Sequence, residues 1–245
     1  NLQNIRTLLF TPANKPERFE KAKQTGADGL IIDLEDSVTL ANKDEARNIV
    51  INYFKEYKKD DSFIQCLRIN SLKTPAGLKD LSALIDAKAY PDVIMVPKTE
   101  YAAKEIAYSS VNVQGLVFGG ADLAADLHAK LAWEPMLNAR SLIIRAAASK
   151  GIAALDVPYL NLKDSDDSGI IEETQKGLGY TGKLAIHPKH IQPIKNTFSP
   201  TTQEIERAKK IVDVYESSGG NACEIDGKMI DVPVYKAAKR ILSFK

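Results

Sequence analysis

The chain has 245 residues, of which 44% are hydrophobic and 27% charged, a composition typical of a soluble globular protein and not of a disordered or membrane-embedded one. Its 33 basic and 32 acidic residues leave a net charge of +1, which excludes a general basic field for nucleic acid and a polybasic membrane anchor. Two distant cysteines and three histidines without metal-ligand spacing argue against a disulfide scaffold or a structural zinc site. No apolar run is long enough for a membrane helix, and the first residues lack the pattern of a signal peptide. We therefore expect a cytoplasmic protein with no nucleic-acid or membrane partner.

Short runs rich in Val, Ile and Leu recur along the chain, and polar stretches with helical spacing separate them, the pattern of buried parallel strands. The predicted strands are Thr7–Phe10, Gly29–Leu34, Phe63–Ile69, Val93–Val96, Gly115–Phe118, Ala153–Val157 and Leu184–Ile186. The predicted helices are Lys15–Thr25, Lys43–Phe54, Gly77–Ala87, Leu137–Ser149 and Gly169–Lys176. Because strands and helices alternate without a linker, we predict a (β/α)8-type TIM barrel over residues 1–199. Only seven strands are recognisable, so the barrel is expected to be incomplete.

The chain changes character after residue 199. Residues Thr201–Ser217 have amphipathic helical spacing, and the pair Asp226-Gly227 between short runs indicates a type I′ hairpin. Asp231-Val232-Pro233 then opens a last helix through Lys236–Leu242. We expect residues 200–245 to form a helical and hairpin extension that acts as a lid or an oligomer contact; a helix that merely closes the bottom of the barrel fits the pattern equally well.

In a (β/α) barrel the functional residues lie where strands end, because the following loops converge on one mouth. The second strand ends in acids, and its period of two places Asp33 and Glu35 on one face and Asp36 on the other. Asp36 or Ser37 could instead cap the next helix, which would explain Asp36 well and Asp33 poorly. We therefore expect the carboxylates of Asp33 and Glu35 to point into the mouth.

Cations end the next two strands. Arg68 is a lone guanidinium that requires a carboxylate or an anionic substrate, so it fits one cluster with Asp33 and Glu35; a purely structural ion pair is the alternative. Lys98 is as consistent with an exposed surface lysine as with a ligand contact. Asp122 follows a glycine turn at the start of a helix, where it could be a helix cap or a ligand of a hard cation.

Several segments, in this order, resemble the citrate lyase beta subunit-like family, within the malyl-CoA and citramalyl-CoA lyase group. The segments are Arg6–Pro12, Asp33–Val38, Leu67–Asn70, Val96–Lys98, Phe118–Leu123, Ile186–Pro188 and Asp226–Pro233. Each one is weak by itself, but together they span nearly the whole chain. The resemblance implies a (β/α) barrel, usually a homotrimer, that uses Mg²⁺ and releases acetyl-CoA and a 2-oxo acid.

The resemblance also implies roles for individual residues. Arg68 would bind the oxo-acid oxygen, Asp33 and Glu35 would line the site and orient Arg68, and Asp122 would bind the metal. Asp231 would enter a neighbouring subunit's mouth as an acid–base group. The candidates for contacts with substrate or CoA are Pro12, Lys15, Arg18, Arg68, Lys98 and His187.

One feature of the family is missing. Its members have a strand ending in Ile-Glu-Thr between the Pro-Lys and Gly-Ala-Asp strands, and that glutamate is the second protein ligand of Mg²⁺. The interval from Lys98 to Gly119 holds only one helix-like stretch and the next strand, so about one β/α unit is absent. Magnesium would then depend on Asp122, water and substrate, with Glu35 as a possible substitute ligand, which puts its affinity in doubt.

The resulting hypothesis is a carbon–carbon lyase that cleaves a 3-hydroxyacyl-CoA thioester to acetyl-CoA and a 2-oxo acid. Citramalyl-CoA is the favoured substrate, with malyl-CoA and citryl-CoA as alternatives. Two other functions remain open: a citryl-carrier-protein lyase subunit of a complex, and a non-catalytic barrel that binds an acyl-CoA.

Overall fold

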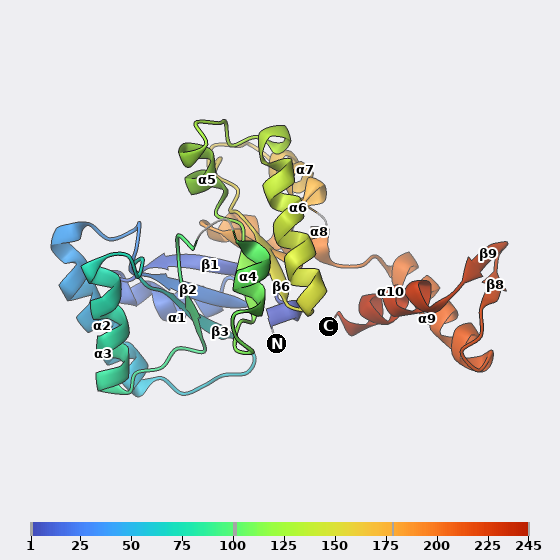
Figure 1. The fold of residues 1–245 in the computed structure, drawn as a ribbon, viewed down its shortest axis with the longest axis horizontal. Coiled ribbons are helices and arrows are strands. Elements are labelled where there is room, and N and C mark those ends of the chain that lie inside the picture. The colour runs from blue at the N-terminus through green and yellow to red at the C-terminus, as the bar shows by residue number, and fades with distance from the viewer. Residues whose placement is uncertain (1, 100–101, 178, 245) are drawn as a thin grey trace. The chain divides into compact units, whose positions relative to one another are not determined.

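The computed structural model describes residues 2–99, 102–177 and 179–244, and the chain divides into two compact units, Asn1–Asn196 and Thr197–Lys245. In the first unit the strands are β1 (Thr7–Pro12), β2 (Gly29–Asp33), β3 (Ile64–Arg68), β4 (Val93–Met95), β5 (Gly115–Val117), β6 (Ala153–Asp156) and β7 (Gly182–Ala185). The α-helices are α1 (Phe19–Lys23), α2 (Lys43–Glu56), α3 (Pro75–Ala87), α4 (Ala103–Tyr108), α5 (Gly120–Asp126), α6 (Trp133–Lys150), α7 (Ser168–Lys176) and α8 (Ile191–Phe198). Short 3₁₀ helices are η1 (Leu2–Asn4), η2 (Pro16–Arg18), η3 (Leu40–Asn42) and η4 (Pro188–His190). Every predicted strand is present, and Figure 1 shows how strands and helices alternate.

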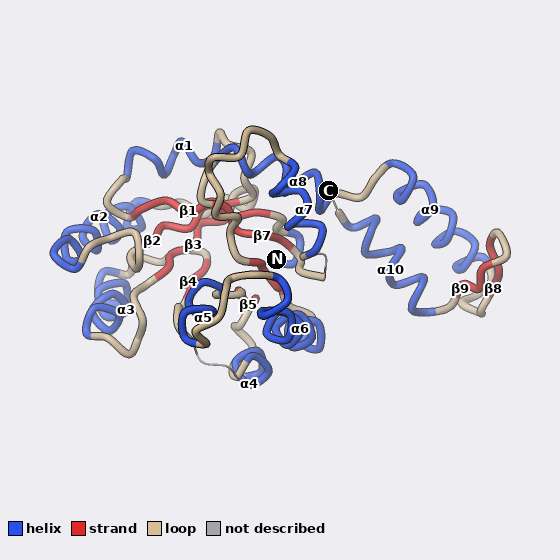
Figure 2. The backbone as a smooth tube through the Cα atoms, turned by 90° about the horizontal axis from the view of Figure 1, so that it is seen from above, coloured by secondary structure: helices blue, strands red, loops and turns tan. Residues whose placement is uncertain are grey.

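The strands of the first unit form one parallel sheet in the order β4-β3-β2-β1-β7-β6-β5. The sheet curls, and helices lie around its outer side (Figure 2). Within the described residues, β4 and β5 each pair with a neighbour on one side only, so the sheet does not close into a ring. The prediction of an incomplete (β/α) barrel is confirmed, and the opening lies between β4 and β5, where the sequence lacks a β/α unit.

The core lies on the inner and outer faces of the central strands. Every residue of β2, β6 and β7 is buried. Most are apolar, as in parallel strands covered on both faces, and the charged ones, Asp33, Asp156 and Lys183, form ion pairs. Ile31, Cys66 and Val93 are register partners on adjacent strands and pack in one apolar cluster inside the barrel. The strands that border the opening are less buried, and Ile94 of β4 is 38% exposed.

The second unit contains α9 (Thr202–Ser217), the antiparallel strands β8 (Cys223–Ile225) and β9 (Lys228–Ile230), and α10 (Val232–Ser243). Thr201 and Glu204 form a reciprocal capping box that starts α9. Asp226 and Gly227 have φ values of 52° and 75°, the left-handed conformations that a type I′ turn requires, so the predicted hairpin is confirmed. The unit has its own apolar core between α9, α10 and the hairpin.

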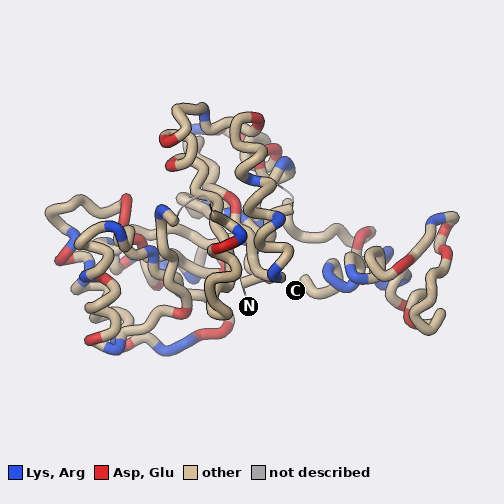
Figure 3. The backbone as a smooth tube through the Cα atoms, viewed as in Figure 1, with Lys and Arg blue, Asp and Glu red and all other residues tan. Residues whose placement is uncertain are grey.

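Charges of both signs are spread along the chain in each unit (Figure 3). Among the helices that the structure describes, none is long and apolar enough to cross a membrane.

Candidate functional site

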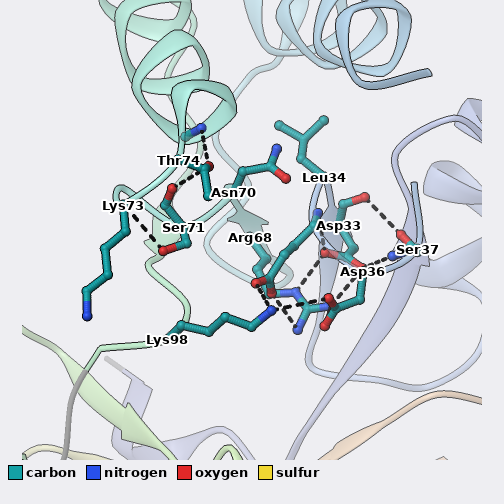
Figure 4. Close-up of polar contacts among 12 residues, drawn as sticks. Asp33, Leu34, Asp36, Ser37, Arg68, Asn70, Ser71, Lys73, Thr74 and Lys98 are labelled. Atoms are coloured by element: carbon teal, nitrogen blue, oxygen red, sulfur yellow. Dashed lines mark hydrogen bonds and ion pairs between the residues drawn. The ribbon is translucent and has the colours of Figure 1, made fainter. Parts of the chain in front are cut away.

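The centre of the site is an ion pair between the last residues of two adjacent strands. Asp33 of β2 and Arg68 of β3 are register partners, so their side chains leave the sheet on the same side. Arg68 Nε lies 2.7 Å from Asp33 Oδ1, and Arg68 Nη2 lies 2.8 Å from Asp33 Oδ2, a bidentate arrangement (Figure 4). The guanidinium also lies 4.8 Å above the ring of Phe10 on β1. Arg68 is therefore held in one orientation from two neighbouring strands.

The carboxylate of Asp33 also organises the turn that follows β2. Its Oδ1 accepts a hydrogen bond from the backbone N–H of Glu35 at 2.9 Å, and its Oδ2 accepts one from that of Ser37 at 3.1 Å. Because the chain turns at Asp33, the strand period ends there, and Asp36 lies at the mouth with Oδ2 3.5 Å from Arg68 Nη2. The predicted orientation of Asp36 to the opposite face is wrong. The alternative, in which Asp36 or Ser37 caps the next helix, is excluded, since Thr39 and Asn42 precede the next helical segments.

Glu35 and Lys98 complete the charged cluster. Glu35 is buried, with Oε2 3.2 Å from Arg68 Nη1 and Oε1 3.1 Å from Lys98 Nζ. The same ammonium lies 3.6 Å from Asp36 Oδ1. Lys98 has a φ of 52°, a left-handed backbone conformation that a residue other than glycine adopts at some cost. Lys98 thus takes part in the cluster of strand-end charges.

Two neighbouring carboxylates have opposite pKa shifts. Burial would raise the pKa of Asp33, but the hydrogen bonds and the charge of Arg68 hold it below its ordinary value. Burial raises the pKa of Glu35, and the opposing effects of Lys98 and Arg68 do not cancel that rise. Asp33 is therefore suited to remain an ionised partner of Arg68, whereas the raised pKa of Glu35 makes it the better proton acceptor of the two.

These residues line a cavity of about 2100 Å³ in the first unit. The sequence-predicted residues in its wall are Pro12, Arg18, Asp33, Glu35, Arg68, Lys98 and Asp122. Lys15 and His187 lie outside that wall, and the Nδ1 atom of His187 accepts a hydrogen bond from the backbone N–H of Lys189 at 3.1 Å. Much of the remaining wall is apolar and belongs to strands on both sides of the opening, including Val93, Met95 and Val117.

Asp122 is exposed near the start of α5. The pKa of Lys98 is raised, first by its hydrogen bond to Glu35 and in smaller part by the charge of Asp122, which places Asp122 within electrostatic range of the cluster. Among the described residues, no three His, Cys, Asp or Glu side chains form a ready metal-binding group. A magnesium ion, however, needs only one or two carboxylates when water and substrate supply the other oxygens, and Asp122 fits that mode. Glu35 could act as a ligand only by giving up an ion pair.

Asp231 lies in the second unit, directly before α10. Its side chain accepts a hydrogen bond from the backbone N–H of Val234 at 3.2 Å and so caps that helix. A structural role for Asp231 is thereby established, and its acid–base role stays a prediction.

Three buried charges that were not predicted from the sequence support the cluster from behind. Lys43 on α2 and Asp80 on α3 bond to the segments that follow β2 and β3, and Arg47 on α2 bonds to Asp80. The available signal was the spacing of four residues between Lys43 and Arg47, which places both on one helix face together with Val50.

The chain matches the family described as HpcH/HpaI aldolase/citrate lyase over residues 6–104 and 101–188. It is 31% identical to the citrate lyase subunit beta of Leuconostoc mesenteroides subsp. cremoris, with 97% of this chain and 92% of that protein covered. It is 25% identical to the human mitochondrial citramalyl-CoA lyase, with 97% and 84% covered. Among solved structures, the CitE protein of Mycobacterium tuberculosis in complex with magnesium, acetoacetate and coenzyme A superposes with a TM-score of 0.81 at 29% identity, over 98% of both chains.

The comparisons also bear on the missing unit. The two segments that match the family overlap at residues 101–104, between the strands that border the opening. The alignment with the Leuconostoc protein spans 282 positions but uses 97% of the 245 residues, so that relative carries about 44 additional positions. That number is large enough for one β/α unit. The predicted relationship to carbon–carbon lyases of the citrate lyase beta subunit type is confirmed, and the chain belongs to the HpcH/HpaI aldolase/citrate lyase family.

Proposed function

We propose that the protein cleaves a 3-hydroxyacyl-CoA thioester to acetyl-CoA and a 2-oxo acid, with citramalyl-CoA as the favoured substrate. The observation that carries the proposal is the fixed guanidinium of Arg68, held bidentately by Asp33 at the mouth of the barrel. A guanidinium has five N–H donors, so its terminal nitrogens keep N–H groups for a substrate oxygen while they bind Asp33 and Glu35. The relationship to the human citramalyl-CoA lyase and to the bacterial citrate lyase subunit supports this class of substrate.

The residues divide the reaction between them. Glu35, whose pKa burial raises, removes the proton from the 3-hydroxyl group directly or through a water molecule. Arg68 stabilises the negative charge on that oxygen as it becomes the ketone of the departing oxo acid. The carbon–carbon bond then breaks, and its electron pair stays on the acetyl thioester as an enolate. Asp231 of a neighbouring subunit, as the carboxylic acid, donates a proton to that enolate, and exchange with water then returns Glu35 and Asp231 to their starting protonation states.

Asp122 would hold the magnesium ion, with water and substrate oxygens completing its coordination. When bound, the ion would add positive charge beside the developing alkoxide. Pro12, Arg18 and Lys98 would contact the substrate or CoA from the cavity wall, and Lys15 and His187 would approach CoA from outside it. We further propose a homotrimer in the cytoplasm, in which Asp231 acts at the mouth of a neighbouring subunit.

The first experiment incubates the purified protein with citramalyl-CoA, malyl-CoA or citryl-CoA, with magnesium or with chelator, and measures acetyl-CoA and oxo acid. Release from citramalyl-CoA that depends on the metal is the expected result. Release from another of the three would keep the reaction and change the substrate. If none of the three thioesters is cleaved but calorimetry shows acyl-CoA binding, the protein would instead be a carrier-protein-dependent subunit or a non-catalytic binder. A fourth assay with citryl-carrier protein as substrate distinguishes these two functions.

Two substitutions at Asp231 distinguish its proposed acid–base role from its role as the N-cap of α10. Asparagine caps a helix about as well as aspartate but cannot exchange a proton, whereas alanine also removes the cap at a cost of ~1 kcal/mol. We expect Asp231→Asn to lower kcat about 100-fold with an unchanged melting temperature, on the scale of general acid–base catalysis. Asp231→Ala should show the same loss of kcat and a lower melting temperature. Wild-type turnover by Asp231→Asn would remove this residue from the mechanism.

A further inference from the structure

Two cations of α2 are buried where a helix normally presents its charges to water. Lys43 is 9% exposed and Arg47 is 8% exposed, and they lie one helical turn apart. Burying a cation costs free energy unless hydrogen bonds or ion pairs compensate for the lost water. The partners of these two side chains therefore indicate what they stabilise. Both reach toward strand ends of the site, and neither forms part of the Asp33–Arg68–Glu35–Lys98 cluster itself.

Lys43 bonds to the turn that carries Glu35. Its ammonium donates to the carbonyl oxygen of Leu34 at 2.6 Å and also to the carbonyl oxygen of Glu35. These two bonds fix the peptide groups on either side of the Glu35 Cα atom, and thereby the direction in which the Glu35 side chain leaves the backbone. Burial lowers the pKa of Lys43, and the charges of Asp33, Asp80, Glu35 and Asp36 oppose that effect. Its positive charge therefore also offsets the mutual repulsion of four carboxylates.

Arg47 supports the end of β3 in the same way, through one intermediate residue. Its Nε lies 2.6 Å from Oδ1 of Asp80 on α3. The other oxygen of Asp80 accepts hydrogen bonds from the backbone N–H of Asn70 at 2.9 Å and from its side-chain amide at 2.7 Å. Asn70 follows Arg68 by two residues. The helix can approach this closely because a Cβ on Gly77 would lie 2.3 Å from the carbonyl oxygen of Ser71.

We propose that Lys43 is a positioning residue for the reaction. It holds the turn after β2 so that the carboxylate of Glu35 stays next to the guanidinium of Arg68. Arg47 and Asp80 hold the end of β3. The two neighbouring side chains of α2 thus tie together the two strand ends that carry the reacting groups. The inference rests on the proposed function, because its effect is read in turnover.

The test is a double-mutant cycle between Lys43→Met and Glu35→Gln. Methionine keeps the unbranched stem and removes the ammonium. We expect Lys43→Met to lower kcat about 10- to 100-fold per folded molecule, on the scale of a small misplacement of a reacting group, with KM changed less than about threefold. In the Glu35→Gln background the same substitution should cost less than about threefold, because the group that it misplaces has already lost its chemistry. Lys55→Met, an exposed position on the same helix, is the matched control and should leave kcat unchanged.

An equal loss of kcat in both backgrounds would overturn the proposal. So would a lower melting temperature with unchanged kcat per folded molecule, since that is the signature of a merely structural lysine. If the wild-type protein cleaves none of the thioesters, the proposed function fails, and crystal structures of the wild type and Lys43→Met then test the positioning role alone. Displacement of residues 34–37 in the variant would support it, and an unchanged turn would overturn it.

Discussion

Replacing Arg68 with lysine is expected to lower kcat about 100- to 1000-fold, equivalent to ~3 to 4 kcal/mol of barrier, as when one donor to a developing oxyanion is lost. Lysine keeps the charge but loses the planar fork that contacts Asp33 through two nitrogens, and it cannot stack in the same way on Phe10. The substrate oxygen would then meet a mobile ammonium in place of a fixed guanidinium. The measurement is kcat and KM with the thioester that the wild type cleaves best.

The control for this prediction is Arg145→Lys, the same substitution at an exposed position of α6, which should leave kcat unchanged. Because Asp33 is buried and loses its bidentate partner, Arg68→Lys is also expected to be less stable, so rates are compared per folded molecule at a temperature below its unfolding transition. A kcat for Arg68→Lys within about threefold of wild type would mean that a positive charge is enough to stabilise the substrate oxygen and that the geometry of the guanidinium is not needed.

Asp156→Ala is expected to cause the largest loss of stability, about 3 to 5 kcal/mol, because it leaves two buried cations without their common partner. Asp156 lies 2.5 Å from Arg140 Nη1 and 3.0 Å from Lys183 Nζ, and all three side chains are buried. Glu173 would still contact Lys183 at 2.6 Å, whereas the guanidinium of Arg140 would lose its ion pair with Asp156 and keep its contacts with aromatic rings such as that of Phe118. The melting temperature should fall by roughly 10 °C for a chain of this size.

Fluorescence of the single tryptophan provides the readout. Trp133 lies in the first unit, with its ring 4.8 Å from Arg140, so its signal follows the unfolding of the unit that contains the pair. The matched control is Glu172→Ala, which removes an exposed ion pair with Lys176 and should leave the melting temperature nearly unchanged. A loss below about 1 kcal/mol for Asp156→Ala would indicate that the interior tolerates the unpaired cations, through water or rearrangement.

Most of the fold could be predicted from the sequence because its signals are local. Strands buried on both faces are rich in apolar residues, as in Gly29–Ile32 of β2 and Ala153–Leu155 of β6, and Asp226-Gly227 has few alternatives to a hairpin turn. The missing β/α unit was also detectable, because it shortens the interval between Lys98 and Gly119. The proximity of Asp33, Glu35 and Arg68 followed from a general property of parallel sheets, whose strand ends meet at one edge.

The roles of the individual charges depend on contacts that exist only in the folded chain. The direction of Asp36 depends on a turn that the Asp33 carboxylate builds with the backbone N–H groups of Glu35 and Ser37, and strand periodicity does not extend into such a turn. The burial of Lys43 on α2 depends on carbonyl groups contributed by the turn after β2. Sequence periodicity reports which residues are apolar, whereas a buried charge is stabilised by partners from other elements, and those partners are known only once the chain has folded.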